Sequence, residues 1–198
     1  MTLLEHTTPT LREGCTSVLE TERLVLRAPR YEDIKLVAKL ANDRRIAENT
    51  LAIPYPYGVK DAESWIAATN TRPGEETFLI EREGDVVGAC GFDLRGGPEP
   101  EIGYWLGVPY WGQGYATEAV RAVIDHAFET RGHTALQAGA RVSNPRSRRV
   151  LEKCGFQWSG VVLRRFHAIN SSAPTDRFKL DRGIWSSLKA WRPSRHIA

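Results

Sequence analysis

Two glycines, Gly112 and Gly114, separate a strand-like run at 101–108 from a long helical pattern. The helical pattern starts at Ala116 and places one apolar face on Ala119, Val120, Val123, Ile124, Ala127 and Phe128. Glycines let the backbone turn so that consecutive N–H groups point the same way. The start of the helix adds unpaired N–H donors. The sequence therefore predicts a strand, a tight loop and a helix that together suit an anion such as a pyrophosphate.

The same glycine pattern has other interpretations. A glycine-rich turn without any ligand would look alike. A dinucleotide-binding site expects a third small residue where Thr117 stands, and its strand should open a βαβ unit rather than follow a meander. A Walker-type loop is excluded, because the chain contains no Gly-Lys-Ser/Thr.

A second motif runs from Asn144 to Phe156. Asn144 is a good N-cap, and Pro145 suits the first helical position, where its missing N–H costs nothing. Gly155 suits the left-handed residue after the helix, with Phe156 supplying the hydrophobic contact that follows. Helix geometry explains these residues, but it does not explain Ser147 or the cluster of Arg146, Arg148 and Arg149.

The remaining pattern is a mixture of strands and helices. Strands are predicted at 19–28, 77–80, 86–92, 134–142, 156–163 and 178–184, the second and third forming a hairpin. Helices are predicted from Tyr31 and, capped by Asp61, around Trp65. This predicts a mixed α/β fold: a mostly antiparallel sheet with helices on both faces. We expect one domain at 19–190, an N-terminal extension at 1–18 and a poorly ordered tail at 191–198.

Composition excludes several classes of protein. The 198 residues contain no run as long as a membrane helix, and the start has no signal-peptide pattern, so a cytoplasmic location without a membrane partner is expected. A net charge of +3 is too small to indicate nucleic-acid binding. Cys15, Cys90 and Cys154 lie far apart, so no metal site is expected, and Cys90 suits a small buried apolar residue.

Taken together, the motifs at 111–119 and 144–156 resemble the GNAT superfamily of N-acetyltransferases. Within it the chain is similar to the branch that includes the ribosomal-protein-alanine N-acetyltransferases, whose first strand resembles 21–27 here. Gly160 and residues 181–185 also match positions in that branch. The family loop usually reads Arg/Gln-x-x-Gly-x-Gly/Ala, and Trp111 departs from its first position. The resemblance implies a single GNAT-like domain.

The resemblance also implies that acetyl-CoA is the co-substrate. N–H groups from Gly112 to Ala116 would bind the pyrophosphate, and 106–108 would pair with the pantetheine arm. Asn144 would lie near the pantetheine and Ser147 near the thiol. Arg149, with Arg146, either meets the 3′-phosphate or forms a solvated basic face. The expected cofactor-binding residues are Leu106, Gly107, Val108, Trp111, Gly112, Gln113, Gly114, Tyr115, Ala116, Asn144, Ser147 and Arg149.

The implied reaction is direct transfer of the acetyl group to an amine. Glu101 is the candidate base, unless it is only an exposed strand residue. Ser147 and Tyr104 are candidate acids. The alternative interpretations are that Ser147 helps to cap its helix and that Tyr104 is a core residue. No catalytic role is expected for the histidines at 126 and 133. The aromatic loop at 55–57 either shapes the amine pocket or simply packs.

Two other classes of function remain open. One is a non-catalytic acyl-CoA-binding module on the same fold. The other is a nucleic-acid or ribosome-binding protein that uses its arginines at 146, 148, 149, 164 and 165, although no RNA-binding motif supports it. The acceptor amine is equally open between a protein N-terminus, a polyamine, an aminoglycoside and an amino-acid analogue, and the protein is expected to be a monomer or a homodimer.

Overall fold

The computed structural model of the protein describes residues 17–69, 71–94 and 97–191. Eight strands form one sheet in the order β1-β2-β3-β4-β5-β6-β8-β7, antiparallel except for the β5–β6 pair. The strands are β1 (Leu19–Glu20), β2 (Val25–Arg27), β3 (Glu76–Arg82), β4 (Asp85–Asp93), β5 (Glu101–Leu106), β6 (Ala135–Arg141), β7 (Gln157–Phe166) and β8 (Ser171–Asp181). The predicted tail lies outside the described residues except for Trp191, as does the predicted extension except for residues 17–18.

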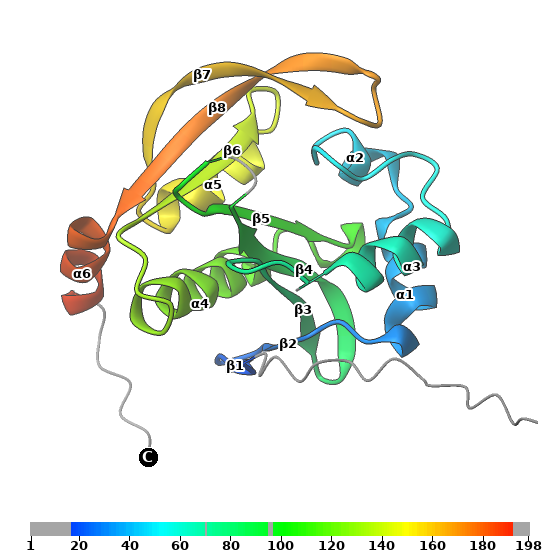
Figure 1. Ribbon diagram of the computed structural model, residues 1–198, viewed down its shortest axis with the longest axis horizontal. Helices are drawn as coiled ribbons and strands as arrows, with labels where there is room; N and C mark the ends of the chain where they lie inside the picture. The colour runs from blue at the N-terminus through cyan, green and yellow to red at the C-terminus, as the bar shows by residue number, and fades with distance from the viewer. Residues whose placement is uncertain (1–16, 70, 95–96, 192–198) are drawn as a thin grey trace, which may run out of the picture.

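Helices cover both faces of the sheet, as predicted (Figure 1). Helices α4, α5 and α6 share one core with the sheet, and α1 and α3 cover the other face. The helices are α1 (Ile34–Ala41), α2 (Arg44–Ala47), α3 (Val59–Ala68), α4 (Tyr115–Glu129), α5 (Pro145–Lys153) and α6 (Arg182–Ala190), with 3₁₀ turns at Tyr31–Asp33 and Val108–Tyr110. The predicted mixed α/β fold is confirmed.

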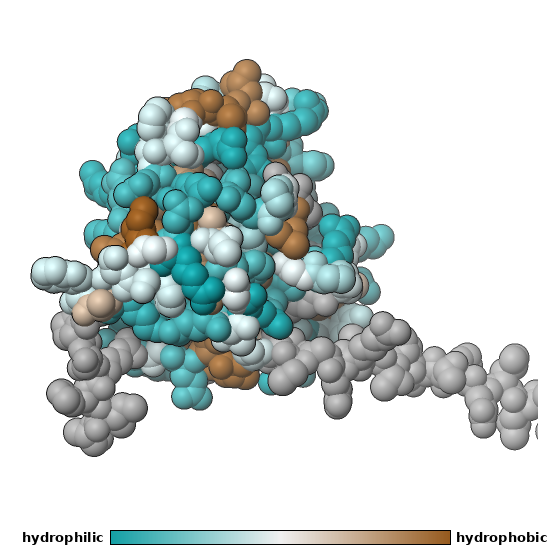
Figure 2. Space-filling view, turned by 60° about the vertical axis from the view of Figure 1, so that its left-hand side comes forward, coloured by the Kyte–Doolittle hydropathy of each residue, from teal (hydrophilic) through white to brown (hydrophobic). Residues whose placement is uncertain are grey.

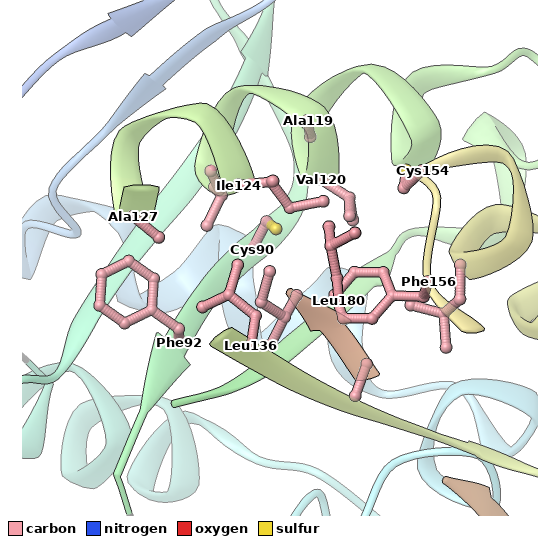
Figure 3. Close-up of a cluster of buried hydrophobic side chains, with 14 of the residues drawn as sticks. Cys90, Phe92, Ala119, Val120, Ile124, Ala127, Leu136, Cys154, Phe156 and Leu180 are labelled. Atoms are coloured by element: carbon pink, nitrogen blue, oxygen red, sulfur yellow. The ribbon is translucent and has the colours of Figure 1, made fainter. Parts of the chain in front are cut away.

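The larger core lies between α4 and the sheet (Figure 3). The apolar face predicted for this helix is buried, and it packs on strand residues such as Leu136 and Leu180. Cys90 lies in the same cluster and is 1% exposed, so its interpretation as a small buried apolar residue is confirmed. Burial raises the pKa of the Cys90 thiol, which keeps it protonated and unreactive.

The single strand predicted at 19–28 is two short strands joined by a turn. The turn is closed by the N–H of Thr21, which donates to the carbonyl of Leu24 at 2.9 Å. The Thr21 hydroxyl also donates to the Glu118 carboxylate at 2.7 Å. The alternation of apolar residues does not reveal this interruption. Leu24 and Leu26 are both buried here, as they would be in one continuous strand.

The strand predicted at 178–184 is wrong at both ends. β8 begins seven residues earlier, at Ser171, and ends at Asp181, which is the N-cap residue of α6. Trp185 is buried on this helix, while Ile184 packs beside it and Leu188 follows one turn later. That helical spacing after a good N-cap residue overrides the short alternation of Phe178 and Leu180.

Two smaller differences concern the segment that joins α1 to β3. The N-cap of α3 is Gly58 rather than Asp61, whose carboxylate accepts from the Gly58 N–H at 2.8 Å. Asp61 therefore supports the helix from its first turn. The short helix α2, capped by Asp43, was not predicted from the sequence.

One strand pair separates almost as soon as it forms. β5 and β6 pair only at Glu101–Gln137 and Ile102–Ala138, and then diverge. On its other side β5 stays paired with β4 as far as Leu106. The gap opened beyond Ile102 therefore exposes one backbone edge of β5 inside the protein.

The opposite end of the sheet finishes in an edge strand. β7 pairs with β8 alone, and its outward side chains include exposed Trp158, Val161 and Leu163. Figure 2 shows apolar side chains gathered at the top of the molecule, over this hairpin.

Candidate functional site

Two adjoining cavities meet at the gap between β5 and β6. The loop cavity, of about 700 Å³, lies against the loop before α4 and the start of α5. The sheet cavity, of about 710 Å³, lies between α1, α3, the β4–β5 pair and the β7–β8 turn. Both cavities are lined by the same five residues, namely Asn49, Thr50, Tyr104, Trp105 and Ser147.

The loop cavity is built on the predicted glycine turn. Gly112 and Gly114 have φ angles of 79° and 85°, a region that side-chain-bearing residues rarely adopt. A Cβ atom on Gly112 would meet nothing within 4 Å, so the space in front of it is open. Within the described residues, the N–H groups of 112–117 donate to no other group of the chain. These donors suit an anion at the positive end of the α4 dipole.

Helix α5 supplies the facing wall of the loop cavity. The Asn144 side chain accepts from the N–H of Ser147 at 3.2 Å, which confirms its N-cap role. Gly155 takes the predicted left-handed conformation, with a φ of 93°. The cavity is also lined by the basic side chains of Arg146, Arg149 and Lys153.

Trp111 fixes the loop to the end of β5. Its indole N–H donates to the carbonyl of Leu106 at 2.8 Å, and its ring lies 5.6 Å from the guanidinium of Arg146. Trp111 replaces the usual first residue of the motif, and here it anchors the loop through a backbone contact.

The free edge of β5 faces the gap. The N–H of Gly107 points toward β4, where it donates to the Val87 carbonyl at 2.9 Å. The direction of the backbone N–H alternates from one strand residue to the next, so the N–H groups of Tyr104 and Leu106 point to the opposite edge of β5. β6 is paired with β5 only as far as Ile102, which leaves both N–H groups for a ligand in the gap.

Tyr104 and Ser147 meet where the cavities join. The Tyr104 hydroxyl lies 2.8 Å from the Ser147 Oγ and 3.1 Å from the Ser147 carbonyl oxygen. Burial raises the pKa of Tyr104 well above its ordinary value, against the smaller opposing effect of the Ser147 hydrogen bond. The tyrosine therefore remains a proton donor at neutral pH.

Aromatic side chains line part of the sheet cavity. Tyr57, Trp65 and Trp105 face it, whereas Tyr55 is exposed and lies outside it. The aromatic loop thus contributes one of its two tyrosines. Burial and the nearby carboxylate of Asp61 raise the pKa of Tyr57 to about 12.

Glu101 lies in the sheet cavity and is paired with a cation. Its carboxylate accepts from Nη1 of Arg164, which reaches it from β7. The side chains are 19% and 30% exposed, so Glu101 is not the freely exposed strand residue that was considered as an alternative. A Cβ atom on Gly139 would lie 3.5 Å from the Glu101 carboxylate and 3.6 Å from Arg164, so Gly139 lies directly beside this ion pair.

Sequence reasoning missed the residues that close the junction. Asn49 and Thr50 follow α2, and they line both cavities. The His167 N–H donates to the carbonyl of Leu51 at 3.0 Å, which ties the β7–β8 turn to this segment. No local motif marks these residues, because only the tertiary fold brings 49–51 to the hairpin.

His126 is buried in a polar cluster away from both cavities. Its Nε2 lies 2.5 Å from the buried Glu76 carboxylate, which also pairs with Arg131. Neither His126 nor Glu76 lines either cavity, and His133 packs its ring against Phe92.

The arginine cluster is divided by the fold. Arg146 and Arg149 line the loop cavity, and Arg164 lines the sheet cavity. Arg148 pairs with Glu152 and Asp176. Arg146 and Arg149 therefore face a different cavity from Arg164.

Two features are absent from the part of the chain that the structure describes. Over 17–69, 71–94 and 97–191, no helix is long and apolar enough to cross a membrane. Within the same ranges, no group of three or more His, Cys, Asp and Glu side chains is arranged to hold a metal ion.

Comparisons with known proteins agree with this geometry. A model of the acetyltransferase (GNAT) domain matches residues 23–157. The chain is 28% identical over 151 residues to the uncharacterized N-acetyltransferase p20 of Bacillus licheniformis, covering 73% of this chain and 84% of that protein. It is 34% identical over 90 residues to the ribosomal-protein-serine acetyltransferase of Escherichia coli, covering 43% and 49%. The Mycobacterium smegmatis RimJ structure, in complex with CoA-disulfide, superposes with a TM-score of 0.78 at 21% identity, covering 89% of this chain and 95% of that one.

Proposed function

The chain belongs to the GNAT family of acetyltransferases, and on that premise we propose that it transfers the acetyl group of acetyl-CoA directly to a primary amine. The acceptor is an N-terminal α-amine of a protein or a small-molecule amine. The family resemblance inferred from the two motifs, including its likeness to ribosomal-protein acetyltransferases, is confirmed. The observation that carries the proposal is the pair of cavities that share Tyr104 and Ser147.

In this proposal acetyl-CoA occupies the loop cavity. Its pyrophosphate accepts from the N–H groups of 112–116, and its pantetheine arm pairs with the free edge of β5 near Leu106. Arg146, Arg149 and Lys153 provide positive charge for the phosphates. The relative from Mycobacterium smegmatis, which was solved with CoA-disulfide, supports this use of the fold.

Transfer takes place at the junction of the cavities. The amine nitrogen forms a bond to the thioester carbon while the carbon–sulfur bond breaks. A backbone N–H of Tyr104 or Leu106 stabilises the carbonyl oxygen, where negative charge develops. Tyr104 then protonates the departing thiolate, and Ser147, hydrogen-bonded to Tyr104, holds its hydroxyl in place.

The amine approaches from the sheet cavity and must be neutral when it attacks. An α-amine, with a pKa of about 7.7–8.0, is roughly one-tenth neutral at pH 7, whereas a lysine amine near 10.4 is almost wholly protonated. An α-amine therefore needs less help from a general base to reach its neutral form. Glu101 takes the proton through water, and its ion pair with Arg164 holds the carboxylate in place at the cavity.

The test is calorimetric titration of acetyl-CoA followed by an amine screen. We expect the parent to bind acetyl-CoA with micromolar affinity and to turn over at least one amine. The Gly112→Asp/Gly114→Asp variant should bind acetyl-CoA at least about 100-fold more weakly. Binding without turnover on a broad panel would favour the non-catalytic acyl-CoA module instead. A folded parent that does not bind acetyl-CoA would refute the proposal.

A further inference from the structure

Arg23 contacts the glycine loop from outside the cavities. It lies in the turn between β1 and β2, and its Nη1 donates to the Gln113 carbonyl, 90 residues away in the sequence, at 3.0 Å. Its guanidinium also stacks 4.7 Å from the centre of the Tyr115 ring. Arg23 does not line either cavity, so it does not contact a ligand there directly.

Glu118, in the first turn of α4, holds Arg23 in this position. Its carboxylate accepts from the Arg23 Nε at 2.8 Å, from the Arg23 backbone N–H at 2.9 Å and from the Thr21 hydroxyl at 2.7 Å. Burial would raise the pKa of Glu118, but the hydrogen bonds from Thr21 and Arg23 outweigh it and the pKa lies below its ordinary value. The carboxylate is therefore ionised and the clamp is closed at neutral pH.

The contact with Gln113 orients a donor that faces the ligand. The peptide between Gln113 and Gly114 is planar, so its C=O and its N–H point in opposite directions. Arg23 holds the carbonyl on the outer side, which turns the Gly114 N–H away from Arg23, and Gly114 lines the loop cavity. A Cβ atom on Gly114 would lie 3.2 Å from the Arg23 Nη2, so the clamp and the glycine fit each other closely.

The clamp also removes an electrostatic conflict. A carboxylate near the start of a helix stabilises the helix, but it repels a ligand anion bound at the same end. The guanidinium of Arg23 pairs with the Glu118 carboxylate at 2.7 Å and cancels that charge.

We propose that Arg23, held by Glu118 and Thr21, is a positioning residue that orients the Gln113–Gly114 peptide for pyrophosphate binding. The inference rests on the proposed binding of CoA at this loop. Through Arg23, the 21–27 segment takes part in cofactor recognition.

The experiment compares CoA with pantetheine, which lacks the pyrophosphate. CoA is titrated by calorimetry and pantetheine by NMR into the parent, Arg23→Gln, Arg23→Lys and the control Arg30→Gln, which alters an exposed pair with Glu32. Arg23→Gln should weaken CoA binding about tenfold and leave pantetheine binding unchanged. Arg23→Lys should recover little, because one ammonium group cannot hold Gln113 and Glu118 together. The control should match the parent.

Several outcomes would overturn the inference. One is an unchanged CoA affinity in Arg23→Gln, and another is an equal loss of pantetheine binding, which would indicate general damage to the fold and would accompany a lower melting temperature. Full recovery of the CoA affinity in Arg23→Lys would mean that the positive charge at position 23 favours CoA binding and that the orientation of the Gln113–Gly114 peptide does not. Failure of the parent to bind CoA would instead refute the proposed function itself, so the two failures are distinguishable.

Discussion

The loop cavity and the sheet cavity have almost the same volume but opposite charge. Basic side chains at 45, 146, 149 and 153 line the loop cavity, and no acidic side chain is among the described residues around it. The described residues around the sheet cavity include the carboxylates of Asp61, Asp93 and Glu101 and one arginine, Arg164. The charge of each cavity is thus opposite to that of its proposed ligand in water: the basic loop cavity suits an anionic cofactor, and the acidic sheet cavity suits a cationic amine.

The cavities also differ in how the chain builds them. Most of the loop cavity comes from two continuous segments, 104–117 and 143–153, and the sheet cavity draws on residues scattered from Val37 to His167. The difference teaches that a phosphate site can rest on local backbone geometry, whereas a site that selects an acceptor depends on side chains from many elements.

The largest effect is expected where the two cavities meet. Tyr104→Phe should lower kcat roughly 100-fold with little change in the KM for acetyl-CoA, because the proton donor is lost and the cofactor contacts remain. Burial raises the pKa of Tyr104, so the parent should keep its rate on the alkaline side to about pH 9.

Steady-state kinetics across pH checks this, with the exposed Tyr31→Phe as the control. An unchanged kcat in Tyr104→Phe would show that another group protonates the thiolate.

An intermediate effect is expected in the loop cavity. Arg149→Ala should raise the Kd for CoA about tenfold at low salt and leave the Kd for 3′-dephospho-CoA almost unchanged, because a charge-assisted contact to the 3′-phosphate is lost. Titration of both ligands, with the exposed Arg44→Ala as control, measures it. Equal losses for the two ligands would place Arg149 at the pyrophosphate instead.

The smallest effect is expected in the sheet cavity. Among the described residues Arg164 is the arginine of this cavity. Arg164→Gln removes its charge and leaves the carboxylates, so the KM for a cationic amine should fall by a factor of about 2–5 while the Kd for CoA stays constant. Kinetics with a fixed acetyl-CoA concentration test this. A higher KM for the amine, or a changed Kd for CoA, would contradict the electrostatic contrast between the cavities.

The sequence predicted the parts of the site that depend on local geometry. The positive φ angles of Gly112 and Gly114 and the cap at Asn144 follow from short-range rules. The Arg23–Glu118 clamp could not be predicted, because nothing local links a residue in the first turn of the sheet to one in α4.

The same division applies to the fold. The long periodic helix α4 begins at Tyr115, one residue before the predicted start at Ala116. α6 was missed because Phe178 and Leu180 alternate as in a strand up to the residue where the helix starts. Asn49 and Thr50 could not be assigned to the site, since tertiary contacts alone bring their segment against the hairpin.

The two cavities adjoin along the five residues that line both, so one molecule of suitable length can occupy both cavities. A compound that joins the CoA sulfur to an amine through a short linker would place its second half at a high effective concentration once the first half is bound. Its affinity would depend on the linker length, since the linker has to pass the residues that line both cavities, such as Asn49, Tyr104 and Trp105. A series of such bisubstrate compounds would therefore act as a ruler for the distance between the thiol and the acceptor nitrogen.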